Sequence, residues 1–119
     1  MTTKFSEKSG DELSQLFAED VGQLVASDDT HGDAYENQDA IARRWTQHLR
    51  DKGILDEDER LYGDDAAIMM TQLKHARHAV GERDVDHLRD AVGYSSIGAA
   101  CMLRDGFADE DEFLTGGDH

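Results

Sequence analysis

The chain has 119 residues, the length of one domain, and 27 acidic residues against 12 basic ones give a formal net charge of −15. Without a basic stripe, this polyanion is not expected to bind nucleic acid directly. No segment reaches the roughly 20 apolar residues of a membrane span, and the N-terminus lacks an apolar signal segment. The single Cys101 excludes an internal disulfide, suits a reducing cytoplasm, and is expected to be a small core residue.

The first predicted element is a helix that begins after Ser9 and ends near Ser27. Ser9 and Glu12 have the spacing of a capping box, in which each side chain bonds the backbone of the other. Leu13, Leu16 and Leu24 belong to the apolar stripe of this helix, and Asp20 falls inside the stripe. A carboxylate in that position requires a partner or the edge of the core.

Three further helices follow in the sequence. Asp33 is predicted to cap the second helix, with Glu36 at its third position, and Gly53 is predicted to stop it. After an acidic link over 54–63, Asp64 or Asp65 is expected to cap a third helix that ends near Val80. Asp84 is expected to cap a fourth helix through about Leu103. The predicted core stripes of these two helices comprise Ala66, Met69, Met70, Leu73, Ala76, Val80, Val85, Leu88, Val92, Ala99 and Leu103.

These elements predict an all-α fold, a single-domain bundle of about four main helices over residues 1–105, followed by an acidic mobile tail over 106–119. Ile68 lies off the apolar stripe of its helix, and small or apolar residues such as Gly93 and Ile97 occupy a second face of the fourth helix. Both features favour a homo-oligomer that buries these extra surfaces.

The type of charged residue also carries information. Asp outnumbers Glu by 18 to 9, and Arg outnumbers Lys by 8 to 4. This composition resembles that of proteins from salt-loving archaea and their viruses, whose acidic surfaces stay solvated while salt screens the repulsion. An ordinary acidic bacterial or phage protein is the alternative. The expected location is the cytoplasm of a halophilic host.

Two groups of residues are candidates for binding a metal or a ligand. His31 and Glu36 flank the start of the second helix, where they could complete the rim of a site, although helix capping explains Asp33 and Glu36 without any ligand. Asp86 and Asp90 lie one helical turn apart and could hold Mg²⁺ through water. The alternatives for this pair are a solvated face or ion pairs with neighbouring basic residues.

Lys74 and Arg77 form the densest positive segment of this acidic chain. Three residues apart on one helix, they could contact a phosphate or carboxylate of a ligand. Because the turn over 81–84 is short, they could equally pair with Asp86 and Asp90 on the antiparallel neighbour. His75 and His78 are expected to face solvent.

Residues from about Thr30 to Ala100 resemble an uncharacterised family of small helical proteins common in tailed phages and prophages. The family pattern is HGD, EN, MM, LK-x-AR and D-x-x-x-D-x-x-GY. This chain matches it at His31-Gly32-Asp33, Glu36-Asn37, Met69-Met70, Leu73-Lys74, Ala76-Arg77, Asp86, Asp90 and Gly93-Tyr94.

More distantly, the layout looks like the MazG-type all-α nucleotide pyrophosphatases, which hold Mg²⁺ with a Glu-x-x-Glu helix and a Glu-x-x-Asp helix. This chain has Asp86 and Asp90 at a spacing of four instead. The leading expectation is a viral accessory protein that binds, and could hydrolyse, a nucleotide or phosphorylated small molecule with Mg²⁺. The alternative is a non-enzymatic helical interaction or structural protein that oligomerises through its helices.

Overall fold

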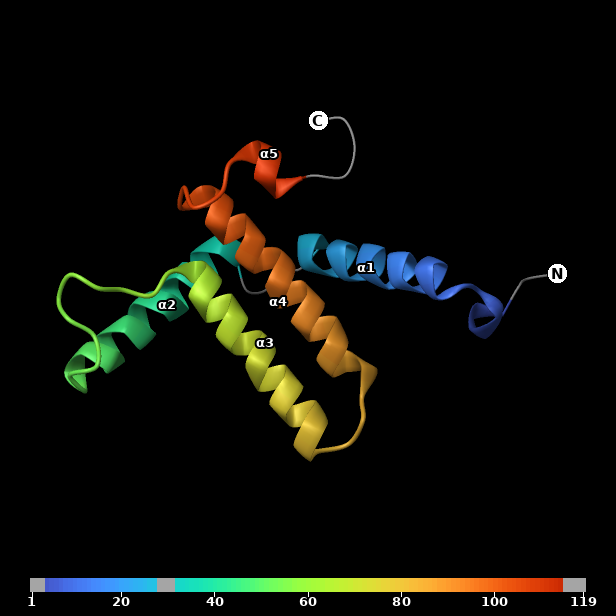
Figure 1. The fold of residues 1–119 in the computed structure, drawn as a ribbon, viewed down its shortest axis with the longest axis horizontal. Helices are drawn as coiled ribbons and strands as arrows, with labels where there is room; N and C mark the ends of the chain where they lie inside the picture. Colours follow the sequence, from blue (N-terminus) through green and yellow to red (C-terminus); the bar gives the residue numbers. More distant parts are fainter. Residues whose placement is uncertain (1–3, 28–31, 115–119) are drawn as a thin grey trace.

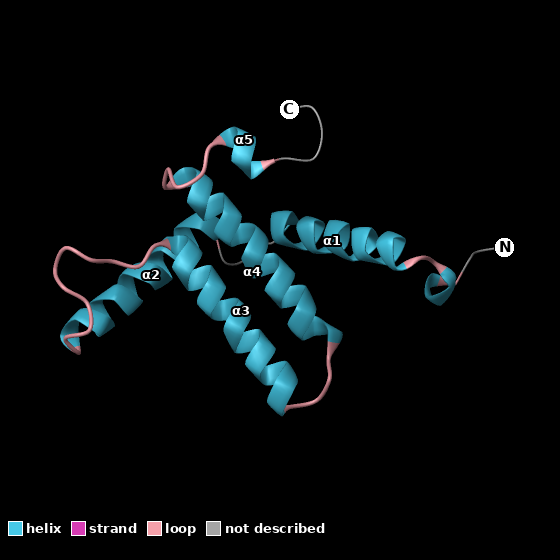
Figure 2. Ribbon diagram, in the orientation of Figure 1, coloured by secondary structure: helices cyan, strands magenta, loops and turns pink. Residues whose placement is uncertain are grey.

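Four long helices make up most of the protein in the computed structural model, which describes residues 4–27 and 32–114 (Figures 1 and 2). No strand occurs in these described ranges, so the prediction of an all-α fold is confirmed. A short 3-10 helix precedes the long helices, and a short α-helix follows them. The elements are η1 (Phe5–Glu7), α1 (Gly10–Ser27), α2 (Ala34–Asp51), α3 (Gly63–Val80), α4 (Val85–Arg104) and α5 (Glu110–Phe113).

The helices begin where capping side chains satisfy free backbone N–H groups. The Ser9 hydroxyl accepts from the backbone N of Glu12 at 3.1 Å. Asp33 and Asp84 accept in the same way at the starts of α2 and α4, at 3.0 and 2.9 Å. These three predicted caps are confirmed.

The predicted cap of α3 is wrong by two or three residues. The helix begins at Gly63, after Tyr62, so Asp64 and Asp65 lie inside its first turn. The Asp65 carboxylate still acts near the helix end, because it accepts a 2.8 Å hydrogen bond from the backbone N of Tyr62. The acidic link before Tyr62 is held by Arg50, whose guanidinium donates to three of its backbone carbonyl oxygens.

The best-packed part of the protein lies where α2 crosses the antiparallel pair α3–α4. Small residues let the helices approach closely, and Gly98 leaves only 3.1 Å between an added Cβ and the Cβ of Ala67. Cys101 is fully buried here against Gly63, which confirms its prediction as a core residue. From α2, the buried side chains are Gln38, Ala42 and Thr46.

The fold is elongated. Its radius of gyration is 17.1 Å, whereas a compact domain of this length has about 13.5 Å. In Figure 1, α1 and α2 leave the α3–α4 hairpin in different directions, and the turn of the hairpin stands away from both. The core is therefore confined to one end of the hairpin and to the contact between α1 and α4.

Much of the predicted core stripe on α3 and α4 is exposed, which corrects the sequence-based prediction. Met69, Leu73 and Val80 on α3 are exposed, as are Val85, Leu88 and Val92 on α4. These apolar residues recur at helical spacing, which predicted that they face a core. The described part of the chain, however, contains no further helix that covers these sides of the hairpin.

Residues 106–114 continue from α4 and include the short helix α5. The ring of Phe107 meets the ring of Tyr62 edge-on, with centroids 4.9 Å apart. Among the described residues, none of the helices combines the length and apolar character needed to cross a membrane.

Candidate functional site

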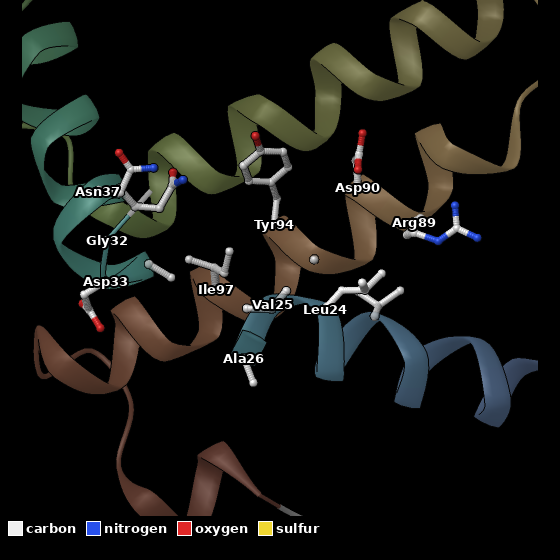
Figure 3. Close-up of a pocket in the computed structure, with 14 residues that line it drawn as sticks. Leu24, Val25, Ala26, Gly32, Asp33, Asn37, Arg89, Asp90, Tyr94 and Ile97 are labelled. Atoms are coloured by element: carbon white, nitrogen blue, oxygen red, sulfur yellow. The ribbon is translucent and has the colours of Figure 1, made fainter. Parts of the chain in front are cut away.

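An open cleft of about 580 Å³ lies between the C-terminal half of α1, the start of α2 and the middle of α4 (Figure 3). Its apolar side comes mainly from α1 and α4, and its polar groups come from α2 and α4. In Figure 3, Asp90 and Tyr94 extend from α4 toward α3, whereas Leu24 and Val25 lie on α1. Its lining includes Val21, Leu24, Val25, Ile97, Asp33, Asn37, Gln38, Arg89, Asp90 and Tyr94.

The start of α2 supplies amide groups to the cleft. Gly32 has a φ of +77°, a left-handed conformation that favours glycine, and Asp33 then caps the helix. Asn37 is exposed, but Gln38 is only 2% exposed. Its Oε1 atom is buried and has no hydrogen-bond partner among the described residues. A buried amide oxygen of this kind ordinarily bonds to water or to a ligand.

The middle of α4 supplies both signs of charge. Lys74 of α3 places its Nζ 3.1 Å from Oδ2 of Asp90, which fixes this acid at the side of the cleft. Arg89 forms an ion pair with Asp86 one turn earlier and lies 4.0 Å from Asp20 of α1. Arg89 therefore links α4 to α1, and Asp20, which the sequence placed either beside a partner or at the edge of the core, is exposed with Arg89 nearby.

The predicted site residues do not share one cleft. Of the two predicted metal ligands, Asp90 lines the cleft, whereas Asp86 lies outside its lining and faces Arg89. Arg77 is exposed on α3, and no ion pair joins it to another described residue. Glu36 is exposed in the first turn of α2, where its backbone N bonds Asp33. His31 lies outside the described residues.

The chemistry of Asp86 and Asp90 suits Mg²⁺, which prefers carboxylate and water oxygens. One oxygen of each carboxylate already faces a basic side chain, so a bound ion would share them with Arg89 and Lys74. In the described part of the chain, the one group of three metal-ligating side chains lies elsewhere, in the exposed link after α2. It consists of Asp56, Asp58 and Glu59.

A second polar cluster, which the sequence did not reveal, lies where α2, α3 and the end of α4 meet. The Tyr35 hydroxyl donates to Asp105, and this bond raises the pKa of the tyrosine. Asp64 has one buried carboxylate oxygen without a described partner, and burial raises its pKa. Burial also raises the pKa of the Cys101 thiol to about 11. The hydrogen bond between Tyr35 and Asp105 joins residues 70 positions apart, which no local motif signals.

Of the two histidines expected to face solvent, His75 is exposed but His78 is not. His78 does not face solvent: it is half-buried and meets His87 edge-on, with ring centroids 5.6 Å apart. The Nδ1 atoms of both rings are buried without a described partner.

Sequence reasoning missed three polar residues that line the cleft. Gln38 and Arg89 gave no motif of their own, although Arg89 stands next to Asp90. Tyr94 belonged to the family pattern but was given no role in the site. Mapping the D-x-x-x-D-x-x-GY pattern onto one helical face would have grouped Asp90 with Gly93 and Tyr94, and all three line the cleft.

The fold and the cleft define an all-α protein whose conspicuous hollow lies between three of its helices. The chain belongs to the family described as a domain of unknown function (DUF6378), whose model matches residues 18–102. This range includes the whole lining of the cleft. Neither a curated protein nor a solved structure matches the chain.

Proposed function

We propose that the protein binds a nucleotide or another phosphorylated small molecule in the α1–α2–α4 cleft. The observation that supports this most is the meeting of separate sequence motifs at one hollow. Gly32-Asp33, Asn37, Asp90 and Gly93-Tyr94 all line it, although they come from different helices or helix starts. Beside them, Gln38 has a buried Oε1 atom without a partner among the described residues.

The cleft combines the groups that such a ligand needs. Leu24, Val25 and Ile97 present an apolar surface on which a flat ring can pack, and Asn37 and Gln38 offer amides to its polar edge. Arg89 is the basic residue in the lining of the cleft. Lys74 lies outside the lining and forms an ion pair with Asp90. Arginine and lysine are the usual protein partners of phosphate.

Magnesium belongs to this proposal because of the charge of the protein. A chain with a formal charge of −15 repels a phosphate, and two partly neutralised bases offset that repulsion incompletely. Asp90 would coordinate a Mg²⁺ ion that is bound to the phosphate. Asp86 lies one turn earlier on α4. The affinity for the ligand is therefore expected to depend on Mg²⁺.

The test is a binding panel of nucleoside mono-, di- and triphosphates and sugar phosphates, each with and without Mg²⁺, in 2 M KCl. A ligand at 100 times its Kd stabilises the protein by about 2.7 kcal/mol, which thermal unfolding detects. Calorimetry then measures Kd for each positive ligand. Release of phosphate or pyrophosphate in the same samples would extend the proposal from binding to hydrolysis. A flat response across the panel would refute it.

Variants locate the site. Asn37→Ala removes an exposed side chain that makes no described hydrogen bond, so a loss of affinity without a loss of stability is expected. Gln23→Ala, on the exposed side of α1 outside the cleft, is the matched control. Equal effects of both substitutions would place binding elsewhere.

A second candidate function is non-enzymatic assembly through the helices, without a small ligand. The exposed apolar residues of α3 and α4 favour it. In that case the panel stays flat while the protein still self-associates.

We further propose that the protein acts in the cytoplasm of a salt-loving host, as an accessory protein of a virus or prophage. The excess of Asp over Glu and of Arg over Lys supports the first part, and the likeness of its motifs to phage proteins supports the second. Its thermal stability is then expected to rise between 0.1 and 2 M KCl, because salt screens the repulsion between carboxylates.

A further inference from the structure

Helix α3 carries an apolar stripe that nothing in the described chain covers. The stripe consists of Met69, Leu73, Ala76 and Val80, and all four side chains are exposed. Met69 and Leu73 are 42% and 41% exposed, and Val80 is 89% exposed. Lys74, between them in sequence, turns toward α4 to meet Asp90, so the stripe itself carries no charge.

The protein as a whole exposes more surface than a monomer of its size. Its accessible area is 8922 Å², whereas a folded monomer of 13.2 kDa has about 6,400 Å². The difference is several times the roughly 800 Å² that each partner contributes to a standard protein–protein interface. The elongated shape agrees with this surplus. There is ample area for a stable dimer.

The spacing of the stripe identifies the partner that fits it. Its members are separated by four, three and four residues, which is the spacing of the apolar seam in a coiled coil. This spacing reads the same in both directions about a point between Lys74 and His75. A helix with the same stripe running antiparallel therefore matches it at every position.

We propose that the stripe Met69–Leu73–Ala76–Val80 binds the same stripe of a second copy of this chain, antiparallel about a two-fold axis. Met69 packs against Val80 of the partner copy, and Leu73 packs against Ala76 of the partner copy. Such an interface is isologous, so it closes on itself and stops at a dimer. The dimer is independent of any ligand in the cleft.

The charged residues beside the stripe tolerate this arrangement. The two-fold axis places Arg77 opposite Gln72 of the partner copy, instead of opposite its own counterpart. The main force that opposes dimerisation is long-range electrostatic repulsion, because each copy has a formal charge of −15. At 1 M salt the screening length is only about 3 Å, so dimerisation is expected to strengthen as salt increases.

The first test measures the mass of the full chain by sedimentation at 0.15 and 2 M KCl. Leu73→Glu is expected to weaken the dimer by at least about 100-fold, because it buries a charge at the centre of the seam. Leu88→Glu is the matched control, since Leu88 is similarly exposed, at 46%, but lies on α4. Circular dichroism verifies that both variants keep their helices. A monomeric wild type at 2 M KCl, or dissociation by Leu88→Glu instead of Leu73→Glu, would overturn the proposal.

A cross-linking experiment tests the antiparallel pairing. Leu73→Cys and Ala76→Cys proteins are oxidised separately and after mixing, and Cys101 contributes little because it is fully buried. Antiparallel pairing predicts a disulfide-linked dimer chiefly in the mixture. A parallel pair would instead link each variant to itself, and the absence of any cross-link would contradict the proposed contact.

Discussion

Lys74 and Asp90 form an ion pair that connects α3 to the cleft-lining face of α4. The Nζ atom lies 3.1 Å from Oδ2, and the lysine side chain is 16% exposed. The apolar stem of Lys74 is therefore enclosed by the hairpin, while its charge neutralises an acid at the side of the cleft. The packing of α3 on α4 and the charge of the cleft depend on the same contact.

Removing the lysine charge is expected to destabilise the hairpin. Lys74→Met keeps the apolar stem but leaves Asp90 without its base, at a cost of about 1 kcal/mol in the free energy of unfolding. Urea denaturation followed by circular dichroism measures this change, and Lys52→Met, on an exposed lysine outside the described ion pairs, is the control. In a double-mutant cycle with Asp90→Asn, a coupling energy of zero would show that the pair contributes nothing.

Two glycines inside helices are expected to respond oppositely to alanine. At Gly63, an added Cβ would lie 2.7 Å from the Sγ of buried Cys101, so Gly63→Ala should cost about 1–3 kcal/mol through overpacking. At Gly22, an added Cβ meets nothing within 4 Å, and Gly22→Ala should stabilise α1 by about 0.5–1 kcal/mol. Thermal unfolding distinguishes the two outcomes. Equal shifts of Tm would mean that α2, α3 and α4 do not pack as described.

The adjacent acids at the start of α3 also predict effects of opposite sign. Burial raises the pKa of Asp64, so the folded protein binds its proton more tightly than the unfolded chain does. The free energy of unfolding therefore falls as pH rises from about 4 through the folded pKa. Asp64→Asn removes this loss and should therefore stabilise the protein at pH 7, with no difference near pH 3, where the carboxyl is protonated.

Asp65→Asn serves as the control for that substitution. It weakens the hydrogen bond from the backbone N of Tyr62, so a loss of about 0.5 kcal/mol at pH 7 is expected. The two variants are compared in urea titrations at both pH values. Destabilisation by Asp64→Asn at pH 7 would contradict the account of its burial.

The sequence predicted the local features of the fold well. Caps at Ser9, Asp33 and Asp84 depend on neighbouring backbone groups, and the spacing of residues encodes them directly. Cys101 was also predicted correctly, because it lies in a run of small and apolar residues. The number of main helices follows from the same short-range signals, although the start of α3 was misplaced.

What the sequence could not supply is the direction in which each helix leaves its neighbour. An apolar stripe shows that a face can be covered, but not whether a helix of the same chain covers it, and Leu73 and Leu88 stay exposed within one chain. The cleft depends on how α1 and α2 cross α4, so Gln38 and Arg89 entered the site without any motif. For Lys74, the sequence allowed either a contact with a ligand or an ion pair with an acid of the next helix. Only the geometry of the hairpin shows that Lys74 pairs with Asp90.

The buried thiol of Cys101 predicts a loss of stability in alkali. Its pKa is about 11 in the folded protein, compared with 9.0 for an ordinary cysteine. Between these pH values the thiol is therefore deprotonated in the unfolded chain but still protonated in the folded protein. The free energy of unfolding should therefore fall by up to about 2.7 kcal/mol as pH rises from 9 to 11. Tyr35, whose pKa is raised by its hydrogen bond to Asp105, adds to the fall at high pH.

Variants separate these two contributions. Cys101→Ala should flatten the decline above pH 9 and Tyr35→Phe should flatten its upper part, although each loses some stability at pH 7 by removing buried contacts. The thiol reagent DTNB gives a second measurement at pH 8, where Cys101 should react far more slowly in the native protein than in urea. A native reaction as fast as the unfolded one would mean that the thiol is accessible, and that the helices around Gly63 and Cys101 open readily.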